Sequence, residues 1–193
     1  MPEHSLWSLY RMNGAKREAL EKRGIATIAA IPGDAEMTEI QARQRRAVTE
    51  GALIVEPGLA GALTTLVYPI AYLDFETVGP AIPVWPGMRP YDQAPVQLSV
   101  HVEKETAAPE ERGGAPRHFE WLADGPDDPR AELARRLIEF IPANGSVVAY
   151  NAVFEAARIA VLEELLPDLA PALAGIRARL WDLLPVVRDH VYH

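Results

Sequence analysis

Cysteine is absent from the 193-residue sequence, which excludes disulfides, thiolate metal sites and cysteine nucleophiles. Long hydrophobic runs are absent as well, because no stretch approaches the ~20 apolar residues of a membrane span, and the N-terminal residues lack the apolar segment of a signal peptide. The five histidines show no metal-ligand spacing, and no glycine-rich loop opens a helix. We therefore expect a cytoplasmic protein that does not enter a membrane.

Positive charge is also in short supply. The net formal charge is −8, from 19 basic and 27 acidic residues. Residues 1–51 carry 8 basic and 7 acidic side chains, whereas residues 52–193 carry 11 and 20. The chain thus has no broad basic face, and we do not expect it to bind nucleic acid tightly and non-specifically on its own. Acidity does not exclude a nuclease, because the metal site of such an enzyme is built from carboxylates.

Hydrophobic periodicity divides the chain into a helical part and a part that mixes strands and helices. Residues 4–50 carry apolar side chains at helical spacing, with glycine or proline after each helical stretch. Hydrophobic residues make up 49% of the chain, as in an ordinary globular protein. We predict a small helical linker module over residues 1–66 and an α/β domain over residues 67–193.

From residue 70 onward the pattern predicts three strands, a helix, a fourth strand and a second helix. The strands are expected at 70–75, 96–103, 117–123 and 146–150, and the helices at 128–141 and 152–166. Residues 168–193 are expected to be helical with one interruption at a proline. Successive strands followed by alternating helix and strand are typical of a mixed sheet with flanking helices.

Two acids end the first predicted strand, in the segment "AYLDFETV" at residues 71–78. Because residues two apart in a strand point to the same side, Asp74 and Glu76 share one face and Phe75 points to the other. Two like charges repel unless a cation lies between them, and oxygen-only sites favour hard ions such as Mg²⁺ or Mn²⁺. A solvated strand end is the simpler interpretation of these two residues alone.

Two further acids lie next to apolar elements. In "YNAVFEAARIAVL", Asn151 stands where a helix N-cap is expected, and Glu155 lies four residues later on the same helix face. A solvated helical acid is one interpretation of Glu155, and a side chain that points into a cleft is the other, because its apolar neighbours leave the helix only a narrow polar face. In "RLWDLLPVVR", Asp182 needs a partner or a metal ion if it is buried. A helix N-cap before Leu183 is an equally good interpretation of Asp182.

These segments resemble a known nuclease family. "YLDFET" looks like the first acidic motif of the DEDD-type 3′–5′ exonucleases, which have an RNase H-like fold, and "YNAVFE" looks like their second motif. "WDLLPVVR" resembles the Asp-Thr-Leu segment that follows. More narrowly, residues 70–193 resemble a bacterial domain of unknown function, DUF2779. In that group an RNase H-like domain commonly follows a Cas4-like or RecB-like nuclease region and a helical linker similar to residues 1–51.

The resemblance implies an RNase H-like mixed sheet and two-metal phosphodiester hydrolysis with Mg²⁺ or Mn²⁺. Asp74 and Glu76 would be metal ligands of the first motif. Glu155 would be the metal-binding acid of the second motif, where the family uses Asp, and Asp182 would be a supporting acid. The third motif, a His or Tyr shortly before a final Asp, has no match before His193. We therefore expect a fragment of a longer DNA-processing protein, with little or no nuclease activity of its own.

The expected partner is nucleic acid, in the first place single-stranded DNA, with a further nuclease domain in the longer protein. The alternative is a non-catalytic module that uses the same fold to bind nucleic acid or a protein.

A proline-rich loop, with "VWPGMRPY" at residues 84–91, follows the first two acids. Trp85, Arg89 and Tyr91 could stack on a base and hold a phosphate there, and Asn151 is the fourth residue expected at a nucleic-acid interface. The structural alternative, which we favour, is a loop folded over the sheet with Trp85 filling a gap.

Overall fold

The computed structural model describes residues 4–104 and 115–192. The chain divides into two compact units, one formed by residues 1–63 with 185–193 and the other by residues 64–184. The first break lies close to the predicted domain boundary at residue 66. The second break lies inside the segment that the sequence assigns to the α/β domain, because residues 185–193 join the helical unit.

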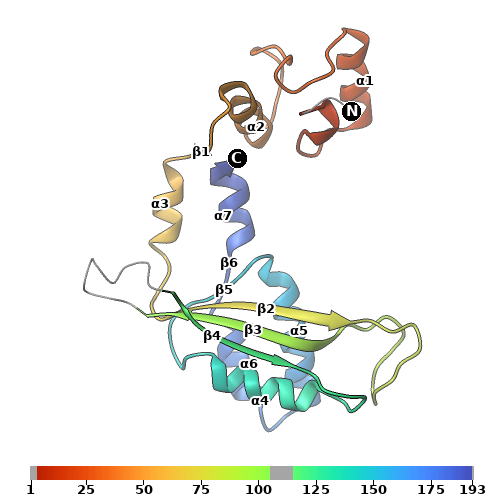
Figure 1. Ribbon diagram of the computed structural model, residues 1–193, viewed down its shortest axis with the longest axis vertical. Coiled ribbons are helices and arrows are strands. Elements are labelled where there is room, and N and C mark those ends of the chain that lie inside the picture. Colours follow the sequence, from red (N-terminus) through yellow and green to blue (C-terminus); the bar gives the residue numbers. More distant parts are fainter. Residues whose placement is uncertain (1–3, 105–114, 193) are drawn as a thin grey trace. The chain divides into compact units, whose positions relative to one another are not determined.

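The first unit consists of short helices and one small strand pair (Figure 1). Its elements are the 3-10 helix η1 Leu6–Ser8, α1 Gly14–Lys22, α2 Glu39–Glu50, α3 Gly58–Leu63, and the antiparallel pair β1 Ile54–Val55 and β7 Val191–Tyr192. Its core is formed by leucine and isoleucine side chains, namely Leu6, Leu9, Leu20, Ile25, Ile28 and Ile31. This unit is therefore mainly helical, and it also includes residues 185–193.

Helix α2 shows why the sequence forms a helix at this place. Thr38 Oγ1 accepts a hydrogen bond from the Gln41 N–H, and the Gln41 side chain accepts one from the Thr38 N–H. This reciprocal capping box satisfies two of the amides that a helix start leaves unpaired. Gly51 ends the helix in the left-handed conformation, which glycine adopts without steric cost.

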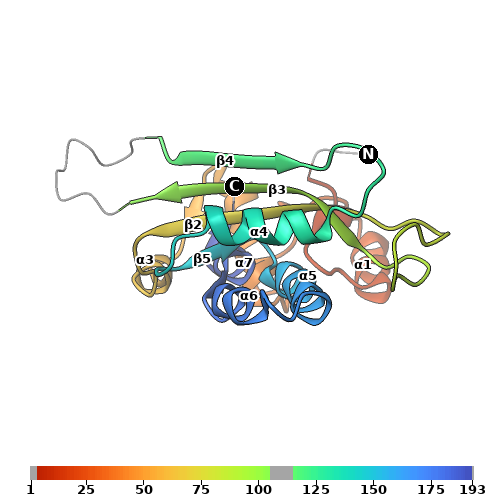
Figure 2. The same ribbon diagram turned by 90° about the horizontal axis from the view of Figure 1, so that it is seen from below.

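The second unit is a five-stranded mixed sheet with three helices packed on one face (Figure 2). The strands are β2 Ile70–Val78, β3 Ala94–Glu103, β4 Arg117–Leu122, β5 Val147–Ala149 and β6 Leu180–Asp182, in the order β4-β3-β2-β5-β6. The helices are α4 Arg130–Phe140, α5 Ala152–Leu165 and α6 Ala170–Arg177. β3 is antiparallel to β2 and β4, whereas β5 and β6 run parallel to β2. The predicted mixed sheet is confirmed.

Alternation along β2 explains why helices cover only one face of the sheet. Ala71, Leu73 and Phe75 are buried, whereas the side chains between them are exposed. Apolar side chains of β3 and of the helices complete this core, among them Leu98, Val100, Leu133, Leu137, Ile159, Leu162 and Leu173. Burial of each large aliphatic side chain contributes about 1.5–3 kcal/mol, so the helix-covered face holds the unit together.

The segment after α6 differs from the prediction. The expectation of helix throughout residues 168–193 is wrong for Leu180–Asp182, which form the edge strand β6, and for Val191–Tyr192, which form β7. β6 pairs in parallel with the buried strand β5. A strand of this length leaves no periodic signal, so its partner decides its conformation. Helix α7, Leu183–His190, follows directly.

None of the helices in the described residues is both long and apolar enough to cross a membrane.

Candidate functional site

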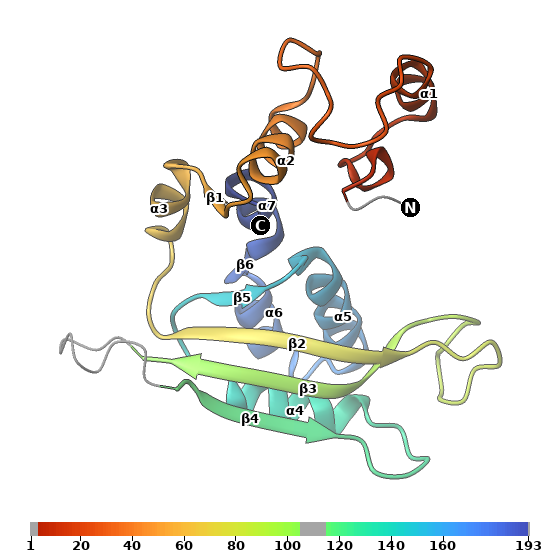
Figure 3. The same cartoon turned by 45° about the horizontal axis from the view of Figure 1, so that its top comes forward.

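The parallel strands β5 and β6 end side by side, whereas their neighbour β2 continues for several residues beyond them (Figure 3). Ala149 at the end of β5 lies opposite Asp182 at the end of β6. Asp74 lies two residues beyond Tyr72, the last residue of β2 that pairs with β5. Carboxyl ends of parallel strands, where helix starts and loops meet, are the usual position of binding sites in α/β sheets. Asp182 thus lies at a strand end, Asp74 lies in the middle of β2, and Glu155 lies on the helix that follows β5.

Glu155 is the buried acid of this edge. It lies in the first turn of α5, it is 3% exposed, and its Oε2 has no hydrogen-bond partner among the described residues. Burial raises the pKa of this carboxyl most strongly, a backbone hydrogen bond lowers it by less, and the charges of Asp74 and Asp182 each add a still smaller rise. A buried carboxylate without a partner is costly. The position therefore requires either a proton or a cation.

Asp182 links two elements of the site. Its Oδ1 accepts a hydrogen bond from the Leu184 N–H at 3.0 Å, in the manner of a helix cap for α7, and another from the Asn151 N–H at 3.1 Å. The cap interpretation of Asp182 is thus confirmed. The second bond fixes the start of α5, and with it the helical turn that carries Glu155.

Asn151 occupies the N-cap position of α5, but its side chain makes no capping hydrogen bond to the described residues. Its backbone is left-handed, with φ of 68°, a conformation that Asn tolerates better than most residues. The Phe154 N–H donates to the main-chain oxygen of Asn151 at 2.9 Å. The predicted cap is therefore right in position and wrong for the side chain, whose exposed amide remains at the helix start.

Asp74 and Glu76 are exposed on the face of β2 that is opposite to Phe75. They thus share one face, as the alternation of the strand predicts. Asp74 contributes to the raised pKa of Glu155, whereas no contribution from Glu76 is resolved within the described part of the chain. A register irregularity lies directly after Glu76. Asp74 is therefore the first-motif acid that acts on Glu155.

The acids do not form a ready-made metal cage. In residues 4–104 and 115–192, no three His, Asp or Glu side chains are arranged as ligands of one ion. The donor set itself suits Mg²⁺ or Mn²⁺, since all the donors are carboxylate oxygens, and the partnerless Oε2 of Glu155 is a free acceptor. The residues thus fit such an ion in chemistry, and binding would require the carboxylates to turn toward it.

The proline-rich loop is held against the turn that precedes α4. Trp85 donates its indole N–H to the Pro126 carbonyl at 3.0 Å. The buried Arg130 donates to the Pro86 carbonyl at 2.7 Å and to Asp128 at 2.6 Å. These bonds agree with a loop that is folded onto the unit, the alternative that the sequence favours for Trp85.

Arg89 and Tyr91 extend outward from the same loop. Tyr91 is 71% exposed. The Arg89 guanidinium is also exposed and lies 3.6 Å from the Asp92 carboxylate. An exposed ion pair of this kind contributes little to stability, so both side chains are accessible to a ligand.

Sequence analysis missed Arg158, one helical turn after Glu155. Its Nη1 donates to the Gln93 carbonyl at 3.3 Å, and its guanidinium carbon lies 5.2 Å from the centre of the Phe154 ring. Its Nε is buried without a partner in the described residues. No pattern in the sequence distinguishes it, because an arginine three residues after a glutamate is expected to pair with that glutamate.

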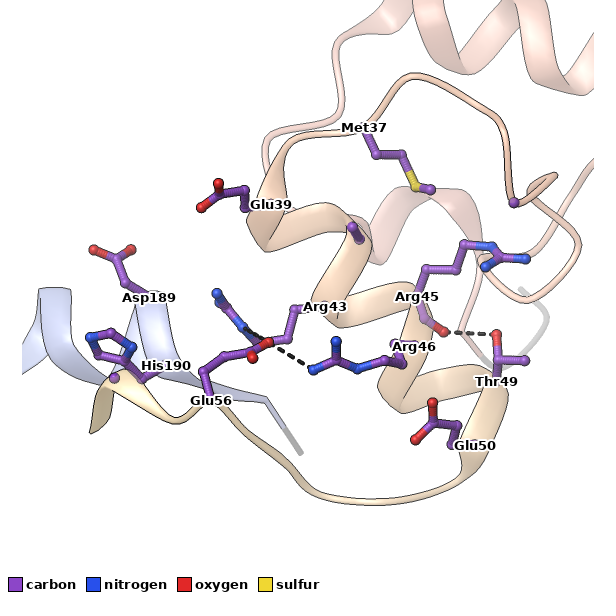
Figure 4. Close-up of a pocket in the computed structure, with 13 residues that line it drawn as sticks. Met37, Glu39, Arg43, Arg45, Arg46, Thr49, Glu50, Glu56, Asp189 and His190 are labelled. Atoms are coloured by element: carbon purple, nitrogen blue, oxygen red, sulfur yellow. Dashed lines mark hydrogen bonds and ion pairs between the residues drawn. The ribbon is translucent and has the colours of Figure 1, made fainter. Parts of the chain in front are cut away.

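The helical unit contains a separate cavity of ≈ 700 Å³ (Figure 4). Arg43 and Arg46 of α2 both donate to Glu56, at 3.2 and 2.7 Å, and these bonds lower the pKa of Glu56. Arg43 also donates to the Arg188 carbonyl at 2.9 Å, and Arg45 donates to the Ile31 carbonyl at 2.7 Å. The arginines of this cavity thus join segments of their own unit.

The comparison with protein families found one model that matches residues 71–193, that of a domain of unknown function, DUF2779. The match spans more than half of the chain and includes Asp74, Glu155 and Asp182. No curated protein matches the chain, and no solved structure does.

Proposed function

We propose that this chain, which belongs to the DUF2779 family, carries a metal-dependent phosphodiesterase site for nucleic acid at the carboxyl edge of its sheet. The observation that carries the proposal is the buried Oε2 of Glu155, which has no hydrogen-bond partner in the described part of the chain and lies where the charges of Asp74 and Asp182 also act on this carboxyl. A divalent cation would offset the repulsion among these carboxylates and the cost of burying Glu155.

The strand order supports this proposal. Counted in chain order within the second unit, the strands run 3-2-1-4-5, with the second strand antiparallel to the others. This is the order expected of an RNase H-like sheet, the fold that the motif resemblance implies. Asp74 and Glu76 are on the central strand, and Glu155 is on the helix after the fourth strand, which agrees with a 3′–5′ exonuclease of the DEDD type.

Each side chain of the edge has a role in this proposal. Asp74, Glu76 and Glu155 would hold Mg²⁺ or Mn²⁺, which supplies a Lewis acid for the phosphate and activates a water molecule. Asp182 positions Glu155, because it fixes the start of α5 through the Asn151 N–H. Glutamate in place of aspartate adds one methylene, which gives the carboxylate more reach from the helix.

The nucleic-acid strand of the substrate would lie between the start of α5 and the proline-rich loop. The exposed amide of Asn151 and the exposed side chains of Arg89 and Tyr91 offer hydrogen bonds, charge and an aromatic surface to it. Trp85 is engaged with the Pro126 carbonyl and supports the loop. We propose single-stranded DNA as the substrate, since only a single strand exposes its bases for stacking.

The test is Mn²⁺ binding by the full chain, followed by electron paramagnetic resonance of the free ion. We expect Asp74→Asn and Glu155→Gln to weaken binding at least about tenfold, since each removes a charged ligand. The matched control is Glu164→Gln, an exposed acid on the same helix, which should bind as the wild type does. Equal binding by all four proteins, or none by the wild type, contradicts the proposal.

Incubation with 5′-labelled single-stranded DNA, with protein in excess, separates catalysis from binding. We expect slow, Mn²⁺-dependent shortening from the 3′ end that Asp74→Asn abolishes. Mn²⁺ binding without any shortening would favour the alternative, a non-catalytic module that binds nucleic acid or a protein. The absence of a preformed ligand cage in the described residues is the observation that favours this alternative.

A further inference from the structure

Arg158 is half-buried and makes fewer hydrogen bonds to the described residues than Arg43, Arg130 or Arg179 does. Arg43 pairs with Glu56, Arg130 pairs with Asp128, and Arg179 donates to three carbonyl oxygens. Arg158 has one carbonyl contact of 3.3 Å, and its Nε has no acceptor in the described residues. A guanidinium presents five N–H donors in a fixed fork, so most of the binding capacity of Arg158 remains unused.

Glu155 and Arg158 lie on one helix but form no ion pair with each other in the described residues. Residues three apart on a helix are neighbours, with Cβ atoms about 5–6 Å apart. An ion pair between them would satisfy both groups, yet Oε2 of Glu155 and Nε of Arg158 are buried without a partner among the residues that the structure describes. The stacking of Arg158 on the Phe154 ring and its bond to Gln93 hold the guanidinium away from Glu155. The fold thus keeps a cation and an anion apart at a cost, which indicates that a ligand uses both.

The position of Arg158 joins the acidic edge to the proline-rich loop. Gln93, whose carbonyl accepts from Arg158, is the last loop residue before β3. The side chain of Gln93 also accepts from the Thr77 hydroxyl, directly after Glu76 on β2, at 3.1 Å. The guanidinium therefore lies where the loop that carries Arg89 and Tyr91 enters β3, next to the end of β2.

We infer that Arg158 is a substrate-binding residue of this site and takes a phosphate oxygen of a nucleic-acid strand. The inference rests on the proposed function, because the phosphate is the ligand that links a metal ion at Glu155 with a guanidinium one helical turn away. Arginine suits this role, since its planar fork binds two phosphate oxygens at once. On binding, the single contact to the Gln93 carbonyl is joined by charge-assisted hydrogen bonds to the phosphate.

The experiment is a titration of a 5′-fluorescein oligothymidylate with the full chain, followed by fluorescence anisotropy at several salt concentrations. It is run once with EDTA and once with Mn²⁺. We expect Arg158→Gln to weaken binding about tenfold and to reduce the slope of log affinity against log salt by about one. Arg158→Lys, which keeps the charge and loses the fork, should bind with intermediate affinity. The matched control is Arg135→Gln, an exposed arginine on α4, which should leave the affinity unchanged.

The outcomes separate this inference from the proposed function. Wild-type affinity in Arg158→Gln, or no oligothymidylate binding by the wild type, overturns the inference even if Mn²⁺ binds normally. Loss of affinity in Arg158→Gln supports it, and Mn²⁺ binding by that variant should remain at the wild-type level. Failure of Mn²⁺ binding in the wild type contradicts the proposed function, and the titration in EDTA still decides the inference. If Arg158→Gln unfolds, Arg158→Met replaces it, because Met keeps an apolar stem against Phe154.

Discussion

The acids of this chain differ in what surrounds them. Hydrogen bonds from arginines lower the pKa of Asp128, of Glu56 and of Asp189. Glu155 has the opposite surroundings, because burial raises its pKa and two carboxylates raise it further. An acid that destabilises the fold when it is ionised indicates a functional role for its position, and this role is what we assign to Glu155.

Replacement of Glu155 should therefore stabilise the metal-free protein at neutral pH. The folded state holds the Glu155 proton more tightly than the unfolded state does, so stability falls as pH rises from the ordinary carboxyl pKa, about 4.3, through the raised pKa of the folded state. We expect Glu155→Gln to have a larger free energy of unfolding than the wild type at pH 7. The difference should shrink toward zero below pH ~4.

Urea unfolding curves at both pH values test this expectation, with Glu164→Gln as the control. A gain of the same size at both pH values would show that the charge of Glu155 is not its cause.

The contribution of Asp182 to stability can be measured separately from any part it has in metal binding. Its replacement by alanine leaves the N–H groups of Asn151 and Leu184 without their acceptor. We expect Asp182→Ala to lower the free energy of unfolding by about 1–3 kcal/mol. Asp168→Ala, at an exposed acid between α5 and α6, should change it by less than about 0.5 kcal/mol. Equal effects of the two substitutions on the free energy of unfolding in urea would argue against the two hydrogen bonds that Asp182 accepts.

At the scale of elements, the sequence reveals those that carry their own pattern. Alternation identifies β2 and β3, and apolar spacing identifies α4 and α5. The two-residue period also puts Asp74 and Glu76 on one face, whereas the sequence leaves open whether Glu155 is solvated or points into a cleft. β6 cannot be read in this way, because a strand of three residues has no period and depends on its pairing with β5.

The same limit explains the residues that sequence analysis misses or misjudges. Arg158 donates to the Gln93 carbonyl instead of pairing with Glu155, and Gln93 comes from a segment that is distant in the sequence. The side chain of Asn151 fails to cap α5 because its backbone is left-handed. Trp85 holds the loop in place and Tyr91 is exposed, and this difference within one loop depends on the hydrogen bond from Trp85 to the Pro126 carbonyl. Each of these facts is set by tertiary contacts and leaves no local signal.

The turn before β5 offers a sharp test of element packing. Gly145 has φ of 86°, and a Cβ added there would lie 1.9 Å from the Pro69 carbonyl oxygen. We expect Gly145→Ala to lower the free energy of unfolding by about 3 kcal/mol or more, because main chain must move.

Gly125 is the matched position for this test. Its φ is 90°, and a Cβ would meet no atom of the described residues within 4 Å. Gly125→Ala should therefore cost only the backbone strain, about 1–2 kcal/mol. Urea unfolding that ranks the two substitutions in the reverse order would contradict the close approach at Gly145.

At the scale of the whole molecule, the last residues belong with the first. β7 pairs with β1, the Gln44 side chain donates to the Tyr192 hydroxyl at 2.8 Å, and the Glu56 N–H donates to the His190 carbonyl at 2.8 Å. Residues 185–193 accordingly fall in the same compact unit as residues 1–63.

Truncation after Leu184 should thus weaken the helical unit and spare the sheet. We expect faster amide hydrogen exchange in α2 and β1, because their partners are lost, and unchanged protection in β2 and β3. Exchange followed by mass spectrometry measures both. Equal loss of protection in the sheet would show that the two units depend on each other for stability.

The central claim is that carboxylates from separate segments share a divalent cation at the edge of the sheet. The most direct measurement is anomalous scattering from crystals of the chain soaked in Mn²⁺. The account predicts an anomalous peak within about 2.0–2.3 Å of carboxylate oxygens of both Glu155 and Asp74, and its absence in crystals of Glu155→Gln. A soaked wild-type crystal with no peak at this edge, or with the ion bound elsewhere, would contradict the account.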